Sequence, residues 1–235
     1  MLLETVDLEF QVGRTQVLRG INLQVGEGEV AGLLGRNGSG KSSILKNLIG
    51  LYRPSRGQIR FKGVDITNSP PRERVAQGLA YSPEDTRVFP DLTAEENIAI
   101  GEWVLEDMKK PKRWSLEKTL EVFPAIERFL KRKGSQLSGG EKKMVSIARA
   151  LALSPLLLLL DESFEGLAPL VVKHFTEAMV RIKEMGVSIL LAESNLRNAS
   201  LVVERAYVVE RGEIIFQGSP QEIKEDERLM MIVGR

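Results

Sequence analysis

The sequence predicts an α/β protein with a buried central sheet. Two short apolar runs, Val30–Leu34 and Leu156–Leu160, lack the alternation of a half-exposed strand, which favours strands buried on both faces. The first run leads into a glycine-rich loop and then into Ile44–Ile49, whose apolar residues have helical spacing. The second run leads into two acidic residues. Before both, Val6–Phe10 and Val17–Val25 are rich in β-branched residues, and glycines separate them, which predicts a further β layer.

Composition excludes several classes of function. The chain has 235 residues, enough for one large domain or two small ones. Lys and Arg total 33 and Asp and Glu total 32, so the basic excess of a typical nucleic-acid-binding protein is missing, and we expect no nucleic-acid partner. Cysteine is absent and His174 is the single histidine, which excludes disulfides, thiol catalysis and sites that need two histidines.

Neither a membrane span nor a signal peptide is expected. No apolar run approaches the ~18 residues that mark a spanning helix. The N-terminus lacks a basic start followed by an apolar stretch. We therefore expect a soluble, cytoplasmic chain.

The loop after the first buried run has the pattern of a phosphate-binding loop. Gly35-Arg-Asn-Gly-Ser-Gly-Lys-Ser42 fits G-x-x-x-x-G-K-[ST], the P-loop, with a strand before it and a helix after it. Glycines let backbone amides approach phosphates, and the helix points its positive dipole end at the same anion. We expect Lys41 to reach the β- and γ-phosphates and the Ser42 hydroxyl to bind Mg²⁺. The candidate nucleotide-binding residues here are Gly35, Arg36, Asn37, Gly38, Ser39, Gly40, Lys41, Ser42 and Ser43.

Asp161 and Glu162 follow five consecutive leucines, at the carboxyl end of the second buried strand. In open α/β sheets ligands bind at this end of the strands. Beside a P-loop, we expect Asp161 to hold Mg²⁺, directly or through water, and Glu162 to polarise the attacking water.

A third segment, Leu137–Glu141 (LSGGE), opens a helix with an apolar face. Ser138 and Glu141 have capping-box spacing. Gly139 and Gly140 lie in the first turn, where each costs about 1 kcal/mol relative to alanine. Exposed amides at a helix N-terminus would compensate as a second anion site, formed by Ser138, Gly139, Gly140 and Glu141. Two phosphate-binding surfaces in one chain predict a dimer in which each nucleotide lies between the P-loop of one chain and the LSGGE of the other.

With these three motifs, the sequence resembles the ATP-binding subunits of ABC transporters along essentially its whole length. More locally it is similar to the branched-chain amino acid branch of that family, and urea-type importers share much of this pattern. The residues that carry the closer resemblance are Pro83-Glu84, Arg87–Thr93, Glu96-Asn97, Val122–Pro124 and Glu165–Pro169.

The resemblance implies roles for several of these residues. Glu84 occupies the Q-loop position, where a side-chain oxygen can bind Mg²⁺. Residues 85–93 would lead into a helical subdomain that receives the membrane subunit, where Phe89 and Trp103 either line the groove or belong to the core. Glu165–Pro169 would form the D-loop, which crosses to the partner's site.

Two positions depart from the family pattern. An aromatic residue usually stacks on adenine where this chain has Val12, with Phe10 as a possible substitute on the same strand. At the H-loop, Ser194 stands where histidine or glutamine is usual. Ser194 is too short for the same contact, so we expect slow hydrolysis by the isolated subunit and faster hydrolysis by Ser194→His. Glu193, Asn195 or a membrane partner are the alternatives for that role.

The resemblance implies a P-loop NTPase with a RecA-like core, an antiparallel β layer and a small helical subdomain. The expected core comprises residues 1–87 and 153–235, and the subdomain comprises 88–152. The leading interpretation is the ATPase of an importer, at the inner face of the cell membrane, for branched-chain or other amino acids. Its expected partners are integral membrane permease subunits, a second ATP-binding subunit (in a homo- or heterodimer) and, indirectly, a substrate-binding protein. The alternatives are a soluble ABC ATPase of DNA repair or translation, for which a coiled-coil insertion, tandem P-loops and a basic surface are missing, and a regulatory module with little hydrolysis.

Overall fold

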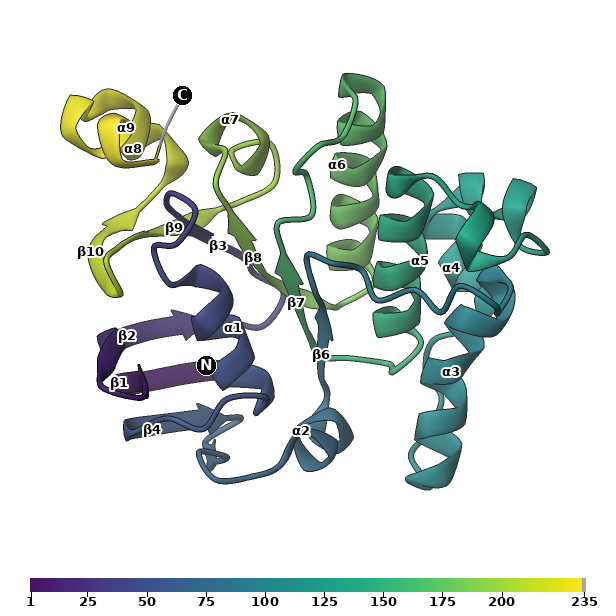
Figure 1. Cartoon of the computed structure of the whole chain (residues 1–235), viewed down its shortest axis with the longest axis horizontal. Coiled ribbons are helices and arrows are strands. Elements are labelled where there is room, and N and C mark those ends of the chain that lie inside the picture. Colours follow the sequence, from purple (N-terminus) through teal and green to yellow (C-terminus); the bar gives the residue numbers. More distant parts are fainter. Residues whose placement is uncertain (234–235) are drawn as a thin grey trace.

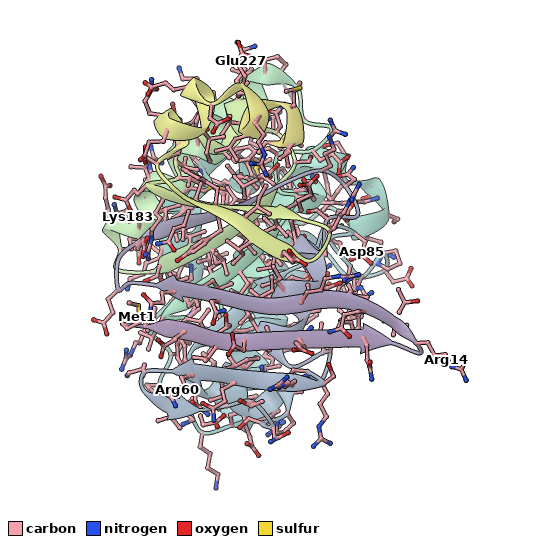
Figure 2. The ribbon with its side chains drawn as sticks, turned by 90° about the vertical axis from the view of Figure 1, so that its left-hand side faces the viewer. Met1, Arg14, Arg60, Asp85, Lys183 and Glu227 are labelled. Atoms are coloured by element: carbon pink, nitrogen blue, oxygen red, sulfur yellow. The ribbon has the colours of Figure 1, made fainter. Side chains whose placement is uncertain are left out.

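Two β-sheets form the framework of the protein. A computed structural model describes residues 1–233 and shows the sheets stacked beside one another, with helices around the larger one (Figure 1). The smaller sheet is antiparallel, has the order β2-β1-β4-β5, and faces the viewer in Figure 2, where Arg14 marks the tip of its long hairpin. Its strands are β1 (Leu3–Val12), β2 (Thr15–Val25), β4 (Arg56–Phe61) and β5 (Val64–Asp65).

The larger sheet is almost entirely parallel, and the two predicted buried runs are strands of it. Its order is β10-β9-β3-β8-β7-β6, and only the edge strand β10 is antiparallel to its neighbour. All residues of β3 and β7 are buried. The strands are β3 (Val30–Leu34), β6 (Leu79–Ser82), β7 (Leu157–Asp161), β8 (Ser188–Glu193), β9 (Arg205–Glu210) and β10 (Glu213–Gly218).

Helices pack on both faces of this sheet, and the segment between β6 and β7 contains several of them. The P-loop helix is α1 (Lys41–Ile49), and α2 (Pro71–Gln77) precedes β6. The segments between β6 and β7 are α3 (Ala94–Asp107), α4 (Leu116–Val122), the 3₁₀ turns η1 (Pro124–Phe129) and η2 (Gly134–Gln136), and α5 (Gly139–Leu151). The remaining helices are α6 (Pro169–Glu184), α7 (Leu196–Ala199), α8 (Pro220–Glu225) and α9 (Glu227–Val233).

The helical stretch agrees in position with the expected subdomain, although the limits at residues 87 and 153 stay a prediction. Residues 234 and 235 of the expected core lie outside the described part. The single histidine, His174, is exposed on α6. Within residues 1–233, none of the helices combines the length and the apolar character needed to cross a membrane.

Successive side chains of the buried strands point to opposite faces of the larger sheet and contribute to two separate cores. Leu158 and Leu160 of β7 belong to a cluster that includes α5 and α6, whereas Leu157 and Leu159 belong to a cluster with α1 and the antiparallel sheet. Successive side chains of a strand point to opposite faces, so a run of leucines supplies both cores. The helix after the P-loop and the helix after LSGGE therefore lie on opposite faces of the larger sheet.

Arg74 of α2 is a fully buried cation that ties this helix to the end of α1. It is 1% exposed and donates to four backbone carbonyls, those of Asn47, Leu48, Thr67 and Ser69, at 2.6–2.9 Å. Two of these carbonyls belong to the last turn of α1, where a cation also meets the negative end of the helix dipole. Burial lowers the pKa of Arg74 to about 10, which leaves the guanidinium charged at neutral pH.

We expect Arg74→Lys to destabilise the protein by about 3 kcal/mol. An ammonium cannot reach all four carbonyls, and each buried acceptor left without a donor costs roughly 1–3 kcal/mol. Urea unfolding of Arg74→Lys checks this, with Arg72→Lys as the control because Arg72 is exposed and pairs only with Asp107. A loss below about 1 kcal/mol in Arg74→Lys would contradict the structural role of the four hydrogen bonds.

Candidate active site

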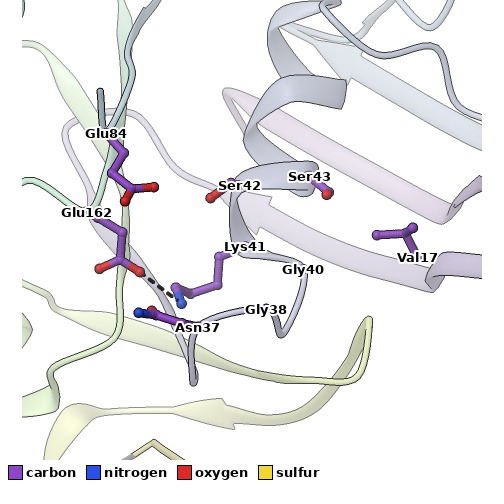
Figure 3. Close-up of a pocket in the computed structure, with 9 residues that line it drawn as sticks. All are labelled: Val17, Asn37, Gly38, Gly40, Lys41, Ser42, Ser43, Glu84 and Glu162. Carbon is purple, nitrogen blue, oxygen red and sulfur yellow. Dashed lines mark ion pairs between the residues drawn. The ribbon is translucent and has the colours of Figure 1, made fainter. Parts of the chain in front are cut away.

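The P-loop encloses one side of a cavity of about 270 Å³ at the N-terminus of α1 (Figure 3). Gly40 caps α1 with a φ of 114°, and no side chain accepts a hydrogen bond from the first-turn amides. Gly35 is required for another reason: a Cβ there would lie 2.2 Å from the carbonyl oxygen of Val209. The free amides at the end of a helix make this end of the cavity suited to an anion. Its lining residues are Val17, Asn37, Gly38, Gly40, Lys41, Ser42, Ser43, Glu84 and Glu162.

Lys41 and Glu162 form a buried ion pair across this cavity (Figure 3). The Lys41 ammonium lies 3.0 Å from Glu162 Oε1, and it donates to the carbonyls of Gly35 at 2.7 Å and Arg36 at 3.2 Å. Each of the two ionic side chains is at most 5% exposed. The sequence predicted both residues for the site but did not predict that they pair with each other. A phosphate entering the loop would compete with Glu162 for the same ammonium.

Ser42 and Asp161 also meet, so two of the three predicted magnesium ligands are adjacent. Ser42 Oγ donates to Asp161 Oδ1 at 2.9 Å, and the Tyr81 hydroxyl donates to Asp161 Oδ2 at 2.9 Å. Burial raises the pKa of Asp161, while these two hydrogen bonds act in the opposite direction. Tyr81 is a functional residue that sequence reasoning missed. Its position at the end of a strand, directly before Ser82-Pro83-Glu84, was the available signal.

Glu84 brings a third oxygen ligand toward this place. It lines the same cavity as Ser42, and burial raises the pKa of its carboxyl, as do the nearby acids Glu165, Asp161 and Glu162. Among residues 1–233 there is no group of three or more His, Asp or Glu side chains placed to hold a metal unaided. The oxygen donors present, Ser42 Oγ with the carboxylates of Asp161 and Glu84, suit a Mg²⁺ ion, which takes one or two carboxylates and completes its shell with phosphates and water. The residues present therefore fit the expected ion.

Glu162 has a strained backbone that several contacts hold in place. Its φ is 46°, in the left-handed region, which is uncommon for a residue with a side chain. Its amide donates to the Ala192 carbonyl at 2.9 Å, and its Oε2 accepts two hydrogen bonds, from the amide and the hydroxyl of Ser194, both at 3.1 Å. The short side chain of Ser194 thus contacts Glu162 directly, a contact that the sequence did not reveal.

Glu193, one of the alternatives considered for the H-loop role, does not line the cavity. It is 1% exposed, and its Oε1 accepts a hydrogen bond from the Phe164 amide at 2.8 Å. Burial raises its pKa to about 8, with the hydrogen bond from Phe164 acting against the rise. Asn195, the other alternative, caps α7 through its side chain. Both residues therefore have structural contacts of their own.

The LSGGE segment has the predicted capping box but lies away from the P-loop. Ser138 Oγ accepts from the Glu141 amide at 3.3 Å, and Glu141 Oε2 accepts from the Ser138 amide at 2.7 Å. A Cβ on Gly139 would meet no atom within 4 Å, so this position faces open space, whereas a Cβ on Gly140 would lie 3.5 Å from the Val171 side chain. None of residues 138–141 is among the described residues that line the P-loop cavity. Their binding role stays a prediction, and it requires a second chain.

Val12, the residue expected to contact adenine, also lies outside the lining of the cavity. Val12 ends β1, is 60% exposed and does not line the cavity, whereas Val17 of the next strand does. The stacking place assigned to Val12 stays a prediction. Phe10 does not replace it, because its ring is 8% exposed and stacks on Tyr52 with centroids 4.8 Å apart. No pattern in the sequence predicted that Val17 would line the cavity, since it does not differ from other residues of the predicted strand.

Comparisons with known proteins agree with this geometry. A model of the ABC transporter family matches residues 18–165, more than half of the chain. The lipopolysaccharide export system ATP-binding protein LptB of Acidithiobacillus ferridurans is 36% identical over 233 residues, which is 98% of this chain and 95% of that protein. The high-affinity branched-chain amino acid transport ATP-binding protein BraG of Pseudomonas aeruginosa is 36% identical over 203 residues, 86% of each chain.

The fold has close counterparts among solved structures. The crystal structure of the ADP conformation of MJ1267, an ATP-binding cassette of an ABC transporter, superposes with a TM-score of 0.86 at 27% identity. The match covers 100% of this chain and 99% of that one. A P-loop beside two acidic residues, a separate LSGGE helix and these matches lead to one conclusion: the chain belongs to the ABC transporter family, as an ATP-binding subunit with ATPase activity.

Proposed function

We propose that the chain hydrolyses ATP between two copies of its nucleotide-binding fold and thereby powers an importer of branched-chain or other amino acids. The observation that carries the catalytic part is the pairing of Glu162 with Lys41 at the mouth of the P-loop. When phosphate takes the ammonium of Lys41, Glu162 is released to accept a proton from the attacking water. Ser194 then holds the carboxylate through Oε2.

The magnesium site proposed here consists of Ser42 and Asp161, with Glu84 close to them. Mg²⁺ would neutralise charge on the phosphate oxygens as it develops during transfer. The hydrogen bonds that Tyr81 and Ser42 donate support an ionised Asp161, which is the form that can bind the cation.

The dimer is supported by the separation of the two anion sites within one chain. The P-loop helix and the LSGGE helix pack on opposite faces of the larger sheet, so their N-termini do not converge on one ligand. In a head-to-tail arrangement, Ser138, Gly139, Gly140 and Glu141 of one chain would cover the nucleotide on the other. The free first turn at Gly139 supports this arrangement, because a backbone amide without a nearby side chain can approach a phosphate closely.

A groove beside α3 is the proposed seat of a membrane permease subunit. It encloses about 410 Å³, and its apolar lining includes Val75, Ile100, Val104, Met108 and Leu153. Arg149 also lines it, and its guanidinium donates to the backbone carbonyls of Thr86 and Arg87, both at 2.8 Å. Such a groove suits a short amphipathic helix, and it would hold this chain at the inner face of the cell membrane.

Phe89 and Trp103, expected in the groove or in the core, are not core residues, and their contact with a membrane subunit stays a prediction. Phe89 is 51% exposed and lies under the Arg149 guanidinium, 5.6 Å from the ring centroid, and Trp103 is 53% exposed. Neither ring is among the groove residues. Both remain available at the edge of the proposed interface.

Import of amino acids is favoured by the branched-chain resemblance of the sequence and by the similarity to BraG. The equally high identity to LptB makes lipopolysaccharide export the second candidate. The choice depends on the permease subunits, since the chain itself contacts the membrane partner and not the transported molecule.

We expect Glu162→Gln to bind MgATP and to accumulate as a closed dimer. The amide cannot accept the proton, so hydrolysis stops while both phosphate-binding surfaces remain. Size-exclusion chromatography with ATP and Mg²⁺ measures the dimer, and Glu184→Gln at the exposed end of α6 is the charge-matched control. A monomer with ATP demonstrably bound would contradict the dimer, and hydrolysis at the wild-type rate would remove Glu162 from its role.

Ser194→Ala should lower kcat by about fivefold, with the dissociation constant for ATP unchanged. The alanine variant loses one of two hydrogen bonds to Glu162 Oε2, and a bond of this kind contributes about 1 kcal/mol. Steady-state hydrolysis and equilibrium ATP titration separate the two parameters. If Ser194→Ala equals the wild type in kcat, the hydroxyl does not position Glu162. Ser194→His, expected from the sequence to be faster, is measured alongside.

In cells whose uptake of leucine depends on this chain, Val104→Glu should abolish uptake of radiolabelled leucine. A buried carboxylate in the apolar groove costs several kcal/mol and should prevent the permease from docking. ATP binding by the purified variant should persist, and Met185→Glu, at an exposed apolar position at the end of α6, is the control.

Normal leucine uptake in cells that lack the chain would contradict amino acid import. Accumulation of lipopolysaccharide at the inner membrane of the same cells would establish the second candidate. Normal uptake with Val104→Glu, in cells that need the chain, would remove the groove from the interface.

A further inference from the structure

Lys143 of α5 reaches across to the loop that follows β7. Its Nζ donates to the carbonyl of Glu162 at 2.6 Å and to the carbonyl of Glu165 at 2.8 Å. The two carbonyls lie at either end of a four-residue turn. One side chain from the helix that begins at LSGGE therefore holds the turn containing the catalytic carboxylate.

This contact completes the restraint of a strained residue. The left-handed backbone of Glu162 costs of order 1–3 kcal/mol and persists only if its surroundings hold it. The amide of Glu162 is held by Ala192 and its side chain by Ser194 and Lys41. The carbonyl is the remaining polar group of this residue, and it accepts from Lys143 at 2.6 Å and, over a longer distance, from the Glu165 amide at 3.4 Å.

Lys143 also stands among four acidic side chains. Burial lowers its pKa, while Glu193, Glu165, Glu162 and Glu84 all act to raise it. The Lys143 cation, together with Lys41 beside Glu162, reduces the mutual repulsion of these carboxylates. The charge also strengthens the two hydrogen bonds, because an ionised donor binds about twice as strongly as a neutral one.

The two lysines that contact Glu162 differ in what a nucleotide would do to them. Lys41 pairs with the carboxylate itself and would turn to the incoming phosphate. Lys143 is not among the described residues that line the P-loop cavity, and it binds backbone carbonyls and not the carboxylate, so its hydrogen bonds can remain throughout the reaction. After Lys41 has left, Lys143 and Ser194 still define where Glu162 points.

We propose that Lys143 is a positioning residue for hydrolysis, which aims the Glu162 carboxylate by holding the 162–165 turn from the LSGGE helix. This inference rests on the proposed role of Glu162. It links the N-terminal half of α5, whose first turn is proposed to cover the partner's nucleotide, to the catalytic residue of the same chain. A displacement of α5 would be passed to Glu162 through two hydrogen bonds.

The test compares Lys143→Met, Lys143→Gln and Lys143→Arg in the full-length chain. We expect Lys143→Met to lower kcat at least tenfold, since a misplacement of about 1 Å can cost 10²-fold in rate. The ATP dissociation constant should stay within about twofold, because the phosphate-binding groups are unchanged. Lys143→Arg should recover most of the rate, and Lys143→Gln, a neutral donor, should fall between.

Lys118→Gln is the matched control. Lys118 also donates to a backbone carbonyl, that of Arg113 at 2.8 Å, at the start of α4 and away from the active site. The melting temperature of each variant reports whether it folds. If Lys143→Met does not fold, the kcat of Lys143→Gln is compared with that of the wild type instead.

Hydrolysis by Lys143→Met within twofold of the wild-type rate, while Glu162→Gln is inactive, would overturn the inference. A loss that appears in ATP affinity instead of kcat, or an equal loss in folded Lys143→Arg and Lys143→Met, would overturn it as well. Wild-type hydrolysis by Glu162→Gln would instead defeat the proposed role of Glu162, so the two failures are distinguishable.

Discussion

The active site depends on a buried ion pair between Lys41 and Glu162. The two residues are far apart in the chain and meet because β3 and β7 flank β8, so the loops after both strands open at the same edge of the sheet. Such a pair is costly to form, because both charges leave water, and it is costly to break from one side, because the remaining charge stays buried. In the proposed mechanism a phosphate would relieve this constraint, since it would give Lys41 a new anionic partner and free Glu162.

The remaining site residues hold Asp161 and Glu162 in place through hydrogen bonds. Tyr81 and Ser42 hold Asp161 from β6 and α1, while Ser194 and Lys143 hold Glu162 from the end of β8 and from α5. These groups come from four different elements, yet each contact is a short hydrogen bond to a carboxylate or a carbonyl. Preorganised dipoles of this kind need no rearrangement when the reaction begins, which is how much of phosphoryl transfer is catalysed.

The division of the protein into two cores explains why one chain is proposed to be insufficient. Helix α1 packs between the two sheets, and α5 packs on the other face of the larger sheet with α6. Each helix presents an N-terminus that suits an anion, but the sheet separates them. Lys143 connects α5 to the P-loop site, because it belongs to α5 and contacts the residues that follow β7.

The sequence by itself determined the elements and the chemistry. Unbroken apolar runs predicted β3 and β7, and LSGGE predicted a capped helix, because local patterns depend only on neighbours in the chain. The P-loop pattern predicted Lys41 and Ser42 for the site, and two acids after a buried strand predicted Asp161 and Glu162, because ligands of α/β sheets bind at the carboxyl ends of the strands. The roles of Tyr81, Lys143 and Val17, the burial of Phe10, and the contact between Ser194 and Glu162 were decided by tertiary structure alone. Each joins residues from different elements, and the distance between such side chains depends on how the sheets and helices pack, which no local pattern encodes.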